Sequence, residues 1–253
     1  MAAPHPETLQ TAVVTGGASG LGALTVKALH RAGFRVVITD LISAPAERLA
    51  QELDLAGETA MAATLDVSKP EDFQRVLDRC VERWGSVEVL VNNAARTVVK
   101  PVLDIGLDEF NAVMATNAGG TFAGCQIFGR HFKQRGYGRL INMASLAGQN
   151  GGTATGAHYA ASKGAILTLT KVFARDLAPF GVTCNAIAPG PMDTPAVRAV
   201  LTPDRLPMAL AGIPVGTLGN PDFVADLVTL LAKPDSGFVT GACWDVNGGI
   251  YMR

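Results

Sequence analysis

The chain has few cysteines, no basic excess and no long apolar run, and each absence excludes a class of protein. Its four cysteines, Cys80, Cys125, Cys184 and Cys243, are far apart and form no CxxC pair. Neither a zinc site nor a disulfide framework is therefore expected. We expect buried free thiols in a reducing cytoplasm. The net charge of -1 argues against a general nucleic-acid binder, which usually carries a basic excess.

No apolar run reaches the roughly 18 residues that a membrane span needs. Residues 1–10 contain neither the basic nor the apolar region of a signal peptide. We therefore expect a cytoplasmic protein that does not bind membranes.

The composition favours one large α/β domain covering residues 1–253. Of its 253 residues, 48% are hydrophobic and 17% are charged, so a large core is possible and disorder is not expected. Apolar periodicity and Gly or Pro breaks predict strands at 11–15, 35–39, 60–65, 87–91, 139–143, 182–187 and 243–246. They predict helices at 20–32, 45–55, 70–84, 157–180 and 221–231, and a long one within 107–135. Such alternation predicts a doubly wound parallel sheet of the Rossmann type.

Tyr159 and Lys163 are the most informative pair of residues. They are about one helical turn apart, so both side chains can lie on one face of a helix. A phenol with a pKa near ~10 is a poor base at neutral pH, and a nearby cation favours the phenolate. The pair can therefore transfer protons, although such spacing alone also describes a solvated helix face.

Further motifs accompany this pair in a fixed order. A glycine-rich turn runs from Thr15 to Gly22 (Thr-Gly-Gly-Ala-Ser-Gly-Leu-Gly), and Asn92-Asn93-Ala94-Ala95 follows a later strand. Ser145 precedes the Tyr-Ala-Ala-Ser-Lys run, and Pro189-Gly190 follows it. From about residue 10 to the C-terminus, the chain resembles the classical short-chain dehydrogenase/reductase family. The resemblance implies about seven strands and an oxidoreductase that uses a nicotinamide cofactor.

The glycine-rich turn is the predicted pyrophosphate site. Its spacing differs from G-x-G-x-x-G, but small residues between a strand and a helix still allow close approach of a phosphate to a helix N-terminus. A turn without a ligand is the alternative. The predicted contacts in this turn are Gly16, Ser19, Gly20, Leu21 and Gly22.

Asp40 predicts the choice of cofactor. It closes the second strand, near the roughly 20-residue separation expected for the acid that binds the ribose hydroxyls. A carboxylate there repels a 2′-phosphate. Residues 17–22 contain no Arg or Lys, and Leu41 follows the acid. We therefore expect NAD, the alternative being that Asp40 simply begins a loop.

The resemblance implies further cofactor contacts on the turns after later strands. Asp66 would bind the adenine amino group, although from the sequence alone it could equally cap a turn. The family usually has Asn-Ala-Gly where this chain has Asn93-Ala94-Ala95. The implied contacts are Asp66, Val67, Asn93, Ala94, Tyr159, Lys163, Pro189, Gly190, Met192 and Thr194.

The same resemblance assigns catalytic roles. Tyr159 would be the acid/base and Ser145 would hold the substrate oxygen. Lys163 would lower the pKa of Tyr159 and hold the nicotinamide ribose. Asn117 would hold a water that relays the proton through Lys163, and an Asn inside a helix is unfavourable by propensity alone.

Three residues could be mistaken for catalytic or metal-binding residues. His158 adjoins Tyr159 but points about 100° away on a helix, so it is expected in the pocket wall or at the surface. His131 is expected at a solvated helix end with Lys133 and Arg135. Asp245 has no partner acids, so we expect no metal site.

A substrate lid is expected around residues 191–219. Its side chains are mostly apolar, and its only basic residues are Arg198 and Arg205. This composition favours an uncharged, hydrophobic secondary alcohol or ketone, although the same residues could simply pack the core. The small and apolar residues of 107–135 and 157–180, together with the resemblance, predict a homotetramer.

Two other functions remain open. Asn150-Gly151-Gly152, Arg130 and Arg175 resemble β-ketoacyl carrier-protein reductases, whose acidic carrier requires cations. Those reductases usually use NADPH, which Asp40 opposes. A non-catalytic nucleotide-sensing regulator could also use this fold, although the intact set of catalytic residues argues against it.

Overall fold

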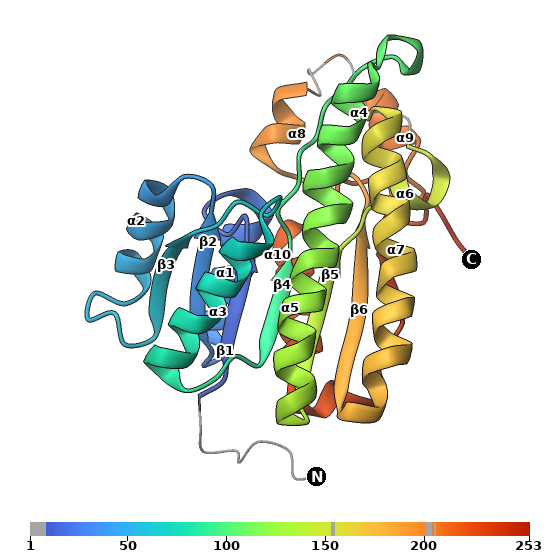
Figure 1. The fold of residues 1–253 in the computed structure, drawn as a ribbon. Helices are drawn as coiled ribbons and strands as arrows, with labels where there is room; N and C mark the ends of the chain where they lie inside the picture. The colour runs from blue at the N-terminus through green and yellow to red at the C-terminus, as the bar shows by residue number, and fades with distance from the viewer. Residues whose placement is uncertain (1–8, 153–154, 201–203, 205) are drawn as a thin grey trace.

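A seven-stranded parallel sheet in the order β3-β2-β1-β4-β5-β6-β7 forms the centre of the molecule (Figure 1). The structure, a computed structural model, describes residues 9–152, 155–200, 204 and 206–253. The order and parallel pairing of the strands confirm the expected doubly wound α/β fold. The strands are β1 (Thr11–Thr15), β2 (Arg35–Asp40), β3 (Ala60–Thr64), β4 (Val89–Asn92), β5 (Gly138–Met143), β6 (Val182–Pro189) and β7 (Cys243–Val246).

Helices cover both faces of the sheet. One face packs against α3 (Pro70–Trp84), α5 (Gly120–Arg135) and α7 (Ala157–Leu177), which lie in front of the sheet in Figure 1. The other face packs against α1 (Gly20–Arg31), α2 (Ser43–Leu53) and α10 (Pro221–Ala232). Over the described ranges, no helix is both long and apolar enough to cross a membrane.

Alternate residues of each strand supply the two cores. Val13 packs on the side of α3 and α5, whereas Ala12 and Val14 pack on the side of α1 and α10, and all three are fully buried. A parallel sheet covered on both faces needs such continuous apolar strands. All four cysteines are free thiols, and Cys80, Cys125 and Cys184 are buried as expected, whereas Cys243 is only partly buried.

The helix expected within 107–135 contains a detail that periodicity did not predict. The chain is helical throughout, but a π-helical turn at Ala115–Gly119 separates α4 (Leu107–Met114) from α5. Three short helices at the carboxyl ends of β5 and β6 were also not predicted: α6 (Ala147–Asn150), α8 (Pro195–Val200) and α9 (Leu206–Ala211). The α-helix expected at 157–180 ends three residues early, at Leu177, and a 3₁₀ turn covers Ala178–Phe180. Other boundaries differ from expectation by two residues or fewer.

The chain order locates the ligand crevice. From β3 at one edge, the chain returns to β4 on the other side of β1. In an open parallel sheet, ligands bind at the carboxyl ends of the strands where the winding direction reverses. The turns after β1 and β4 therefore border the crevice.

Candidate active site

The turn between β1 and α1 has positions that only glycine can occupy. Gly16 has a φ of 60°, and a Cβ at Gly22 would lie 2.0 Å from the Gly16 carbonyl oxygen. A Cβ at Gly20 would meet nothing within 4 Å, so the space there is open. Ser19 precedes α1 without a side-chain capping hydrogen bond. The first amides of α1 thus border open space, which fits a pyrophosphate.

The turn after β4 braces the glycine-rich turn. The Asn93 side-chain amide donates to the carbonyl oxygens of Thr15 and Gly16, each at 3.0 Å. The backbone amides of Asn93 and Ala94 both donate to Thr15 Oγ1 at 3.0 Å. Sequence reasoning placed Asn93 against the cofactor. The structure shows its side chain holding the two turns together.

Asp40 bridges the end of β2 and the glycine-rich turn. Its Oδ2 accepts a hydrogen bond from the Ala18 amide at 3.2 Å, and its Oδ1 accepts one from the Leu41 amide at 2.8 Å. Leu41 is 66% exposed. The carboxylate therefore lies beside the turn predicted to hold the pyrophosphate, as a ribose-binding acid must.

The Asp66 carboxylate forms hydrogen bonds within its own turn, which is the alternative that the sequence left open. Its Oδ1 accepts hydrogen bonds from the Ser68 hydroxyl at 2.7 Å and from the Ser68 amide at 3.0 Å. These bonds hold the pKa of Asp66 below its usual range. Asp66 therefore caps a turn, and its contact with adenine stays a prediction.

Three predicted cofactor residues are apolar and contribute to packing. Leu21 lies against the core beneath α1. Val67 is 8% exposed, and a Cβ at Gly120 would lie 2.9 Å from it. Met192 is 7% exposed and pairs with Gly219 in an isolated parallel bridge. These three residues therefore pack within the protein, and a contact with the cofactor would be a second role.

The turn after β6 runs beside β7. Pro189 ends β6, and the Gly190 amide donates to the Val246 carbonyl at 2.8 Å. A Cβ at Gly190 would lie 2.9 Å from Asn247 Cα. Thr194 Oγ1 accepts from the Val197 amide at 3.3 Å at the start of α8. Among the residues that the structure describes, none accepts a hydrogen bond from the Thr194 hydroxyl.

Lys163 and Tyr159 lie together on α7. Lys163 is 3% exposed, its Nζ donates to the Met143 carbonyl oxygen at 2.6 Å, and it lies 5.6 Å from the centroid of the Tyr159 ring. Burial lowers the pKa of Lys163 to about 8. Burial also raises the pKa of Tyr159, although hydrogen bonds with Ser145 and Thr97 act in the opposite direction.

The raised pKa of Tyr159 corrects an expectation. We expected Lys163 to lower it, but desolvation of the phenol is the largest effect. The ammonium directs its hydrogen bond at the Met143 carbonyl, and it is itself buried. Burial thus favours the protonated phenol over the phenolate in this structure.

Two hydroxyl side chains contact Tyr159. Ser145 was predicted, and its Oγ also accepts from the Ala147 amide at 3.1 Å. Thr97 was missed. Its position in the sequence could have indicated it, because Thr97 follows the Asn93–Ala95 turn and Arg96 at the carboxyl end of a parallel strand.

Asn117 lies within the π-helical turn and is fully buried. Its Oδ1 accepts from the Arg96 amide at 2.7 Å, and its Nδ2 donates to the Arg96 carbonyl at 3.1 Å. Nδ2 also donates to Ser162 Oγ at 2.9 Å. Asn117 thus connects the loop after β4 to the residue before Lys163. π-Helical turns frequently mark functional sites, and the proposed water relay stays a prediction.

The structure narrows the expectation for His158, by excluding the surface, and corrects the expectation for His131. His158 is fully buried rather than at the surface: its Nδ1 accepts from the Tyr159 amide at 2.9 Å, and its Nε2 lies 3.6 Å from Glu109 Oε1. His131 is half-buried and accepts from the Val87 amide at 3.4 Å, and burial lowers its pKa. It is therefore not a solvated helix end.

Asp245 is an ion-pair residue. Its Oδ2 lies 2.9 Å from Arg253 Nε, and its Oδ1 accepts from Gln149 Nε2 at 2.6 Å. The first contact joins the C-terminal residue to β7, and the second joins β7 to α6.

The lid is described only in part. Arg198 Nη2 donates to Asp193 Oδ2 at 2.6 Å, so this lid cation is already paired. Ile213 is buried, whereas Met208 is 76% exposed. Leu201 and Arg205, both counted in the lid by the sequence, lie outside the described residues.

The comparisons with known proteins agree with this geometry. A family model described as "Enoyl-(Acyl carrier protein) reductase" matches residues 16–251. The chain is 39% identical to 4-formylbenzenesulfonate dehydrogenase of Comamonas testosteroni, over 95% of this chain and 97% of that protein. It is 35% identical to the short-chain reductase protein NovJ of Streptomyces niveus (94% and 92%). It is 34% identical to the 3-oxoacyl-[acyl-carrier-protein] reductase of Vibrio cholerae (96% and 98%).

The chain therefore belongs to the classical short-chain dehydrogenase/reductase family. It is an oxidoreductase of that family, whose members use nicotinamide cofactors.

Proposed function

We propose that the protein is an NAD-dependent oxidoreductase that interconverts a hydrophobic secondary alcohol and its ketone. The observation that supports this most is the cluster in which Ser145 and Thr97 contact the Tyr159 phenol beside the buried Lys163. The relative from Comamonas testosteroni is named for 4-formylbenzenesulfonate, which carries a carbonyl group on an aromatic ring, and this supports a carbonyl substrate with an aromatic body.

Each residue of the cluster has a distinct task. Tyr159 gives its phenolic proton to the carbonyl oxygen in reduction and takes the alcohol proton in oxidation. Ser145 and Thr97 orient that oxygen through their hydroxyls. Lys163, held by the Met143 carbonyl, supplies positive charge beside the phenol. When bound, NAD accepts or supplies the hydride.

The choice of NAD rests on Asp40. The carboxylate lies at the end of β2 with Oδ2 on the Ala18 amide. A ribose with free hydroxyls can donate hydrogen bonds to it, whereas a 2′-phosphate would be repelled. The open glycine-rich turn and the first amides of α1 would hold the pyrophosphate.

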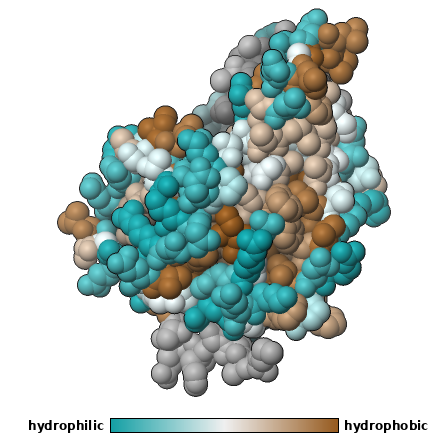
Figure 2. Space-filling model, in the orientation of Figure 1, coloured by the Kyte–Doolittle hydropathy of each residue, from teal (hydrophilic) through white to brown (hydrophobic). Residues whose placement is uncertain are grey.

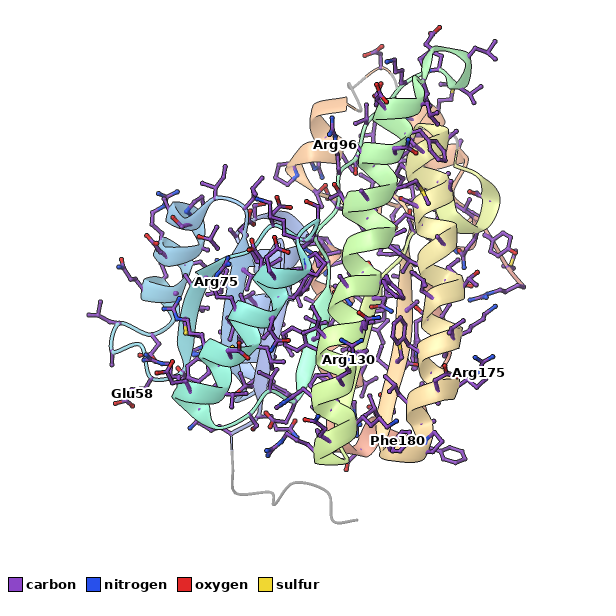
Figure 3. All side chains as sticks on the ribbon, in the orientation of Figure 1. Glu58, Arg75, Arg96, Arg130, Arg175 and Phe180 are labelled. Atoms are coloured by element: carbon purple, nitrogen blue, oxygen red, sulfur yellow. The ribbon has the colours of Figure 1, made fainter. Side chains whose placement is uncertain are left out.

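A 3-oxoacyl carrier-protein reductase is the second candidate, favoured by the relative from Vibrio cholerae. Arg130 of α5 and Arg175 of α7 offer cations to an acidic carrier, and they lie far from α8 (Figure 3). Arg175 is already paired with Asp176 at 2.8 Å. A nucleotide-sensing regulator without turnover is the third candidate.

One assay separates the three candidates. Purified protein is given secondary alcohols with NAD+ or NADP+, and 3-oxoacyl carrier protein with NADH or NADPH, while absorbance of the reduced cofactor is followed. We expect turnover of alcohols with NAD+. Preference for the carrier-bound substrate, lost on reversing the charges of Arg130 and Arg175, would establish the second candidate. Cofactor binding without turnover would establish the third.

We also propose a cytoplasmic homotetramer built on α5 and α7. Figure 2 shows an apolar band along these helices, where Phe122 is 44% exposed and Val172 is 39% exposed. The Phe122 and Phe173 rings lie 5.8 Å apart across the two helices. Such a face suits a second copy of the chain. Light scattering at micromolar concentration should give a tetramer, and a monomer would contradict the proposal.

A further inference from the structure

Arg96 is a cation held at the edge of the active site. It directly follows the Asn93–Ala95 turn, and its side chain is exposed. Asn117 bonds to both its amide and its carbonyl, at 2.7 and 3.1 Å, so its backbone is fixed from the protein interior. Figure 3 shows Arg96 beside α4 and α8, at the carboxyl end of the sheet.

Three other cations on segments that follow the strands are already paired. Lys100 Nζ lies 2.7 Å from Glu109 Oε2, Arg198 bonds to Asp193, and Arg253 bonds to Asp245. Within the described part of the chain, the Arg96 guanidinium forms no ion pair. Lys163 is buried and its Nζ already bonds to the Met143 carbonyl.

The position of Arg96 relative to the acid/base is also defined. Thr97, its neighbour in the chain, contacts the Tyr159 phenol. Adjacent Cα atoms are about 3.8 Å apart, so the Arg96 backbone lies one residue from a side chain that contacts the phenol. The loop that follows carries apolar side chains in solvent: Val99 is 69% exposed and Val102 is 64% exposed. A cation next to apolar surface suits an amphipathic ligand.

We propose that Arg96 binds an anionic group, a carboxylate or a sulfonate, on the part of the substrate remote from the reacting carbon. The inference rests on the proposed function and deepens it. A guanidinium binds such groups through two parallel hydrogen bonds. The sequence favoured an uncharged substrate because only the cations of the lid were considered, and Arg96 lies outside the lid.

The test compares two secondary alcohols that differ only in charge: 4-(1-hydroxyethyl)benzoate and 1-(4-methylphenyl)ethanol. The kcat/KM of each is measured with saturating NAD+ for the wild type, Arg96→Gln, Arg96→Lys and the distant control Arg130→Gln. We expect the wild type to prefer the benzoate. Arg96→Gln should lower kcat/KM for the benzoate by about 10- to 100-fold, mainly through KM, since a charged hydrogen bond contributes about that much.

The matched substrates separate the possible roles of Arg96. With Arg96→Gln, kcat/KM for the methyl compound and the KM for NAD+ should stay within about twofold of wild type, and Arg96→Lys should recover part of the benzoate activity. Equal losses for both alcohols, or a raised KM for NAD+, would show a structural or cofactor role and overturn the proposal. Wild-type preference for the methyl compound would overturn it as well.

A binding measurement separates this inference from the proposed function. The affinity of 4-acetylbenzoate for the protein with NADH is measured by calorimetry, which needs no turnover. Weaker binding by Arg96→Gln but not by Arg130→Gln supports the anion site even if neither alcohol is oxidised. Unchanged binding rejects the anion site even if both alcohols are oxidised.

Discussion

The two ends of the crevice are built differently. At the cofactor end, short turns follow β1, β2 and β4 directly, and backbone amides, glycines and one carboxylate form the surface. At the chemical end, Tyr159, Lys163 and Asn117 lie on long helices that pack against the sheet. Each of these three is held by a group distant in sequence. The first end is formed mainly by backbone, and the second keeps the Lys163 ammonium away from water.

This difference predicts which kind of substitution should impair each end of the crevice. The cofactor end depends on space, so an added methyl group should damage it. The chemical end depends on protons and charge, so isosteric changes that remove one polar atom should damage it while the cofactor still binds.

The largest expected effect is at the chemical end. Tyr159→Phe removes only the phenolic oxygen, and turnover should fall by ~10²–10⁴-fold, the usual contribution of acid/base catalysis. Affinity for NAD, measured by fluorescence titration, should stay near wild type, which separates the two ends. Activity above about a hundredth of wild type would exclude Tyr159 as the proton donor.

Burial of Lys163 predicts a pH-dependent stability. Its pKa falls from 10.5 in the unfolded chain to about 8 in the folded protein, so between these values the unfolded state binds more protons and stability should rise with pH. Relative to Lys163→Met, the wild type should gain up to ~3 kcal/mol between pH 8 and 10.5, at ~1.4 kcal/mol per unit.

Urea unfolding at a series of pH values measures this difference. Lys171→Met, which changes an exposed lysine on the same helix, serves as the control. A difference between wild type and Lys163→Met that is flat from pH 8 to 10.5 would show that Lys163 is better solvated than the structure indicates.

Gly22→Ala should damage the cofactor end. The new Cβ would lie 2.0 Å from the Gly16 carbonyl oxygen, which is backbone and cannot rotate away. We expect a stability loss of ~1–3 kcal/mol and at least about tenfold weaker NAD binding, equivalent to ~1.4 kcal/mol. Gly106→Ala is the control, because a Cβ there meets nothing within 4 Å. Wild-type affinity in Gly22→Ala would show that the turn does not contact the cofactor.

The smallest expected effect is a change of cofactor preference. Wild type should use NAD at least about tenfold more efficiently than NADP, which requires only ~1.4 kcal/mol. Asp40→Ala should narrow that ratio while Tyr159-dependent chemistry with NAD continues. The ratio of kcat/KM for the two cofactors is the measurement. Equal efficiency in the wild type would refute the role of Asp40.

The strands and the motifs on their turns could be predicted because their signals are local. The strands β1 and β7 and the helix α3 have the predicted bounds, since apolar runs, Pro and Gly mark both ends. The π-helical turn at Asn117 could not be predicted, because its periodicity is the same as that of the helices it joins. Resemblance pointed to Asn117, but its bonds to Arg96 and Ser162 join segments far apart in the chain.

The sequence by itself determined the parallel α/β fold, the family and the positions of the candidate site residues, since these follow from local periodicity and ordered motifs. Only the tertiary structure decided the electrostatics: the raised pKa of Tyr159, the lowered pKa of Lys163 and the burial of His158. It also revealed Thr97 against the phenol and Arg96 free of an ion pair in the described ranges. The physical reason is that desolvation and pairing depend on neighbours distant in sequence, and only the folded chain brings those neighbours together.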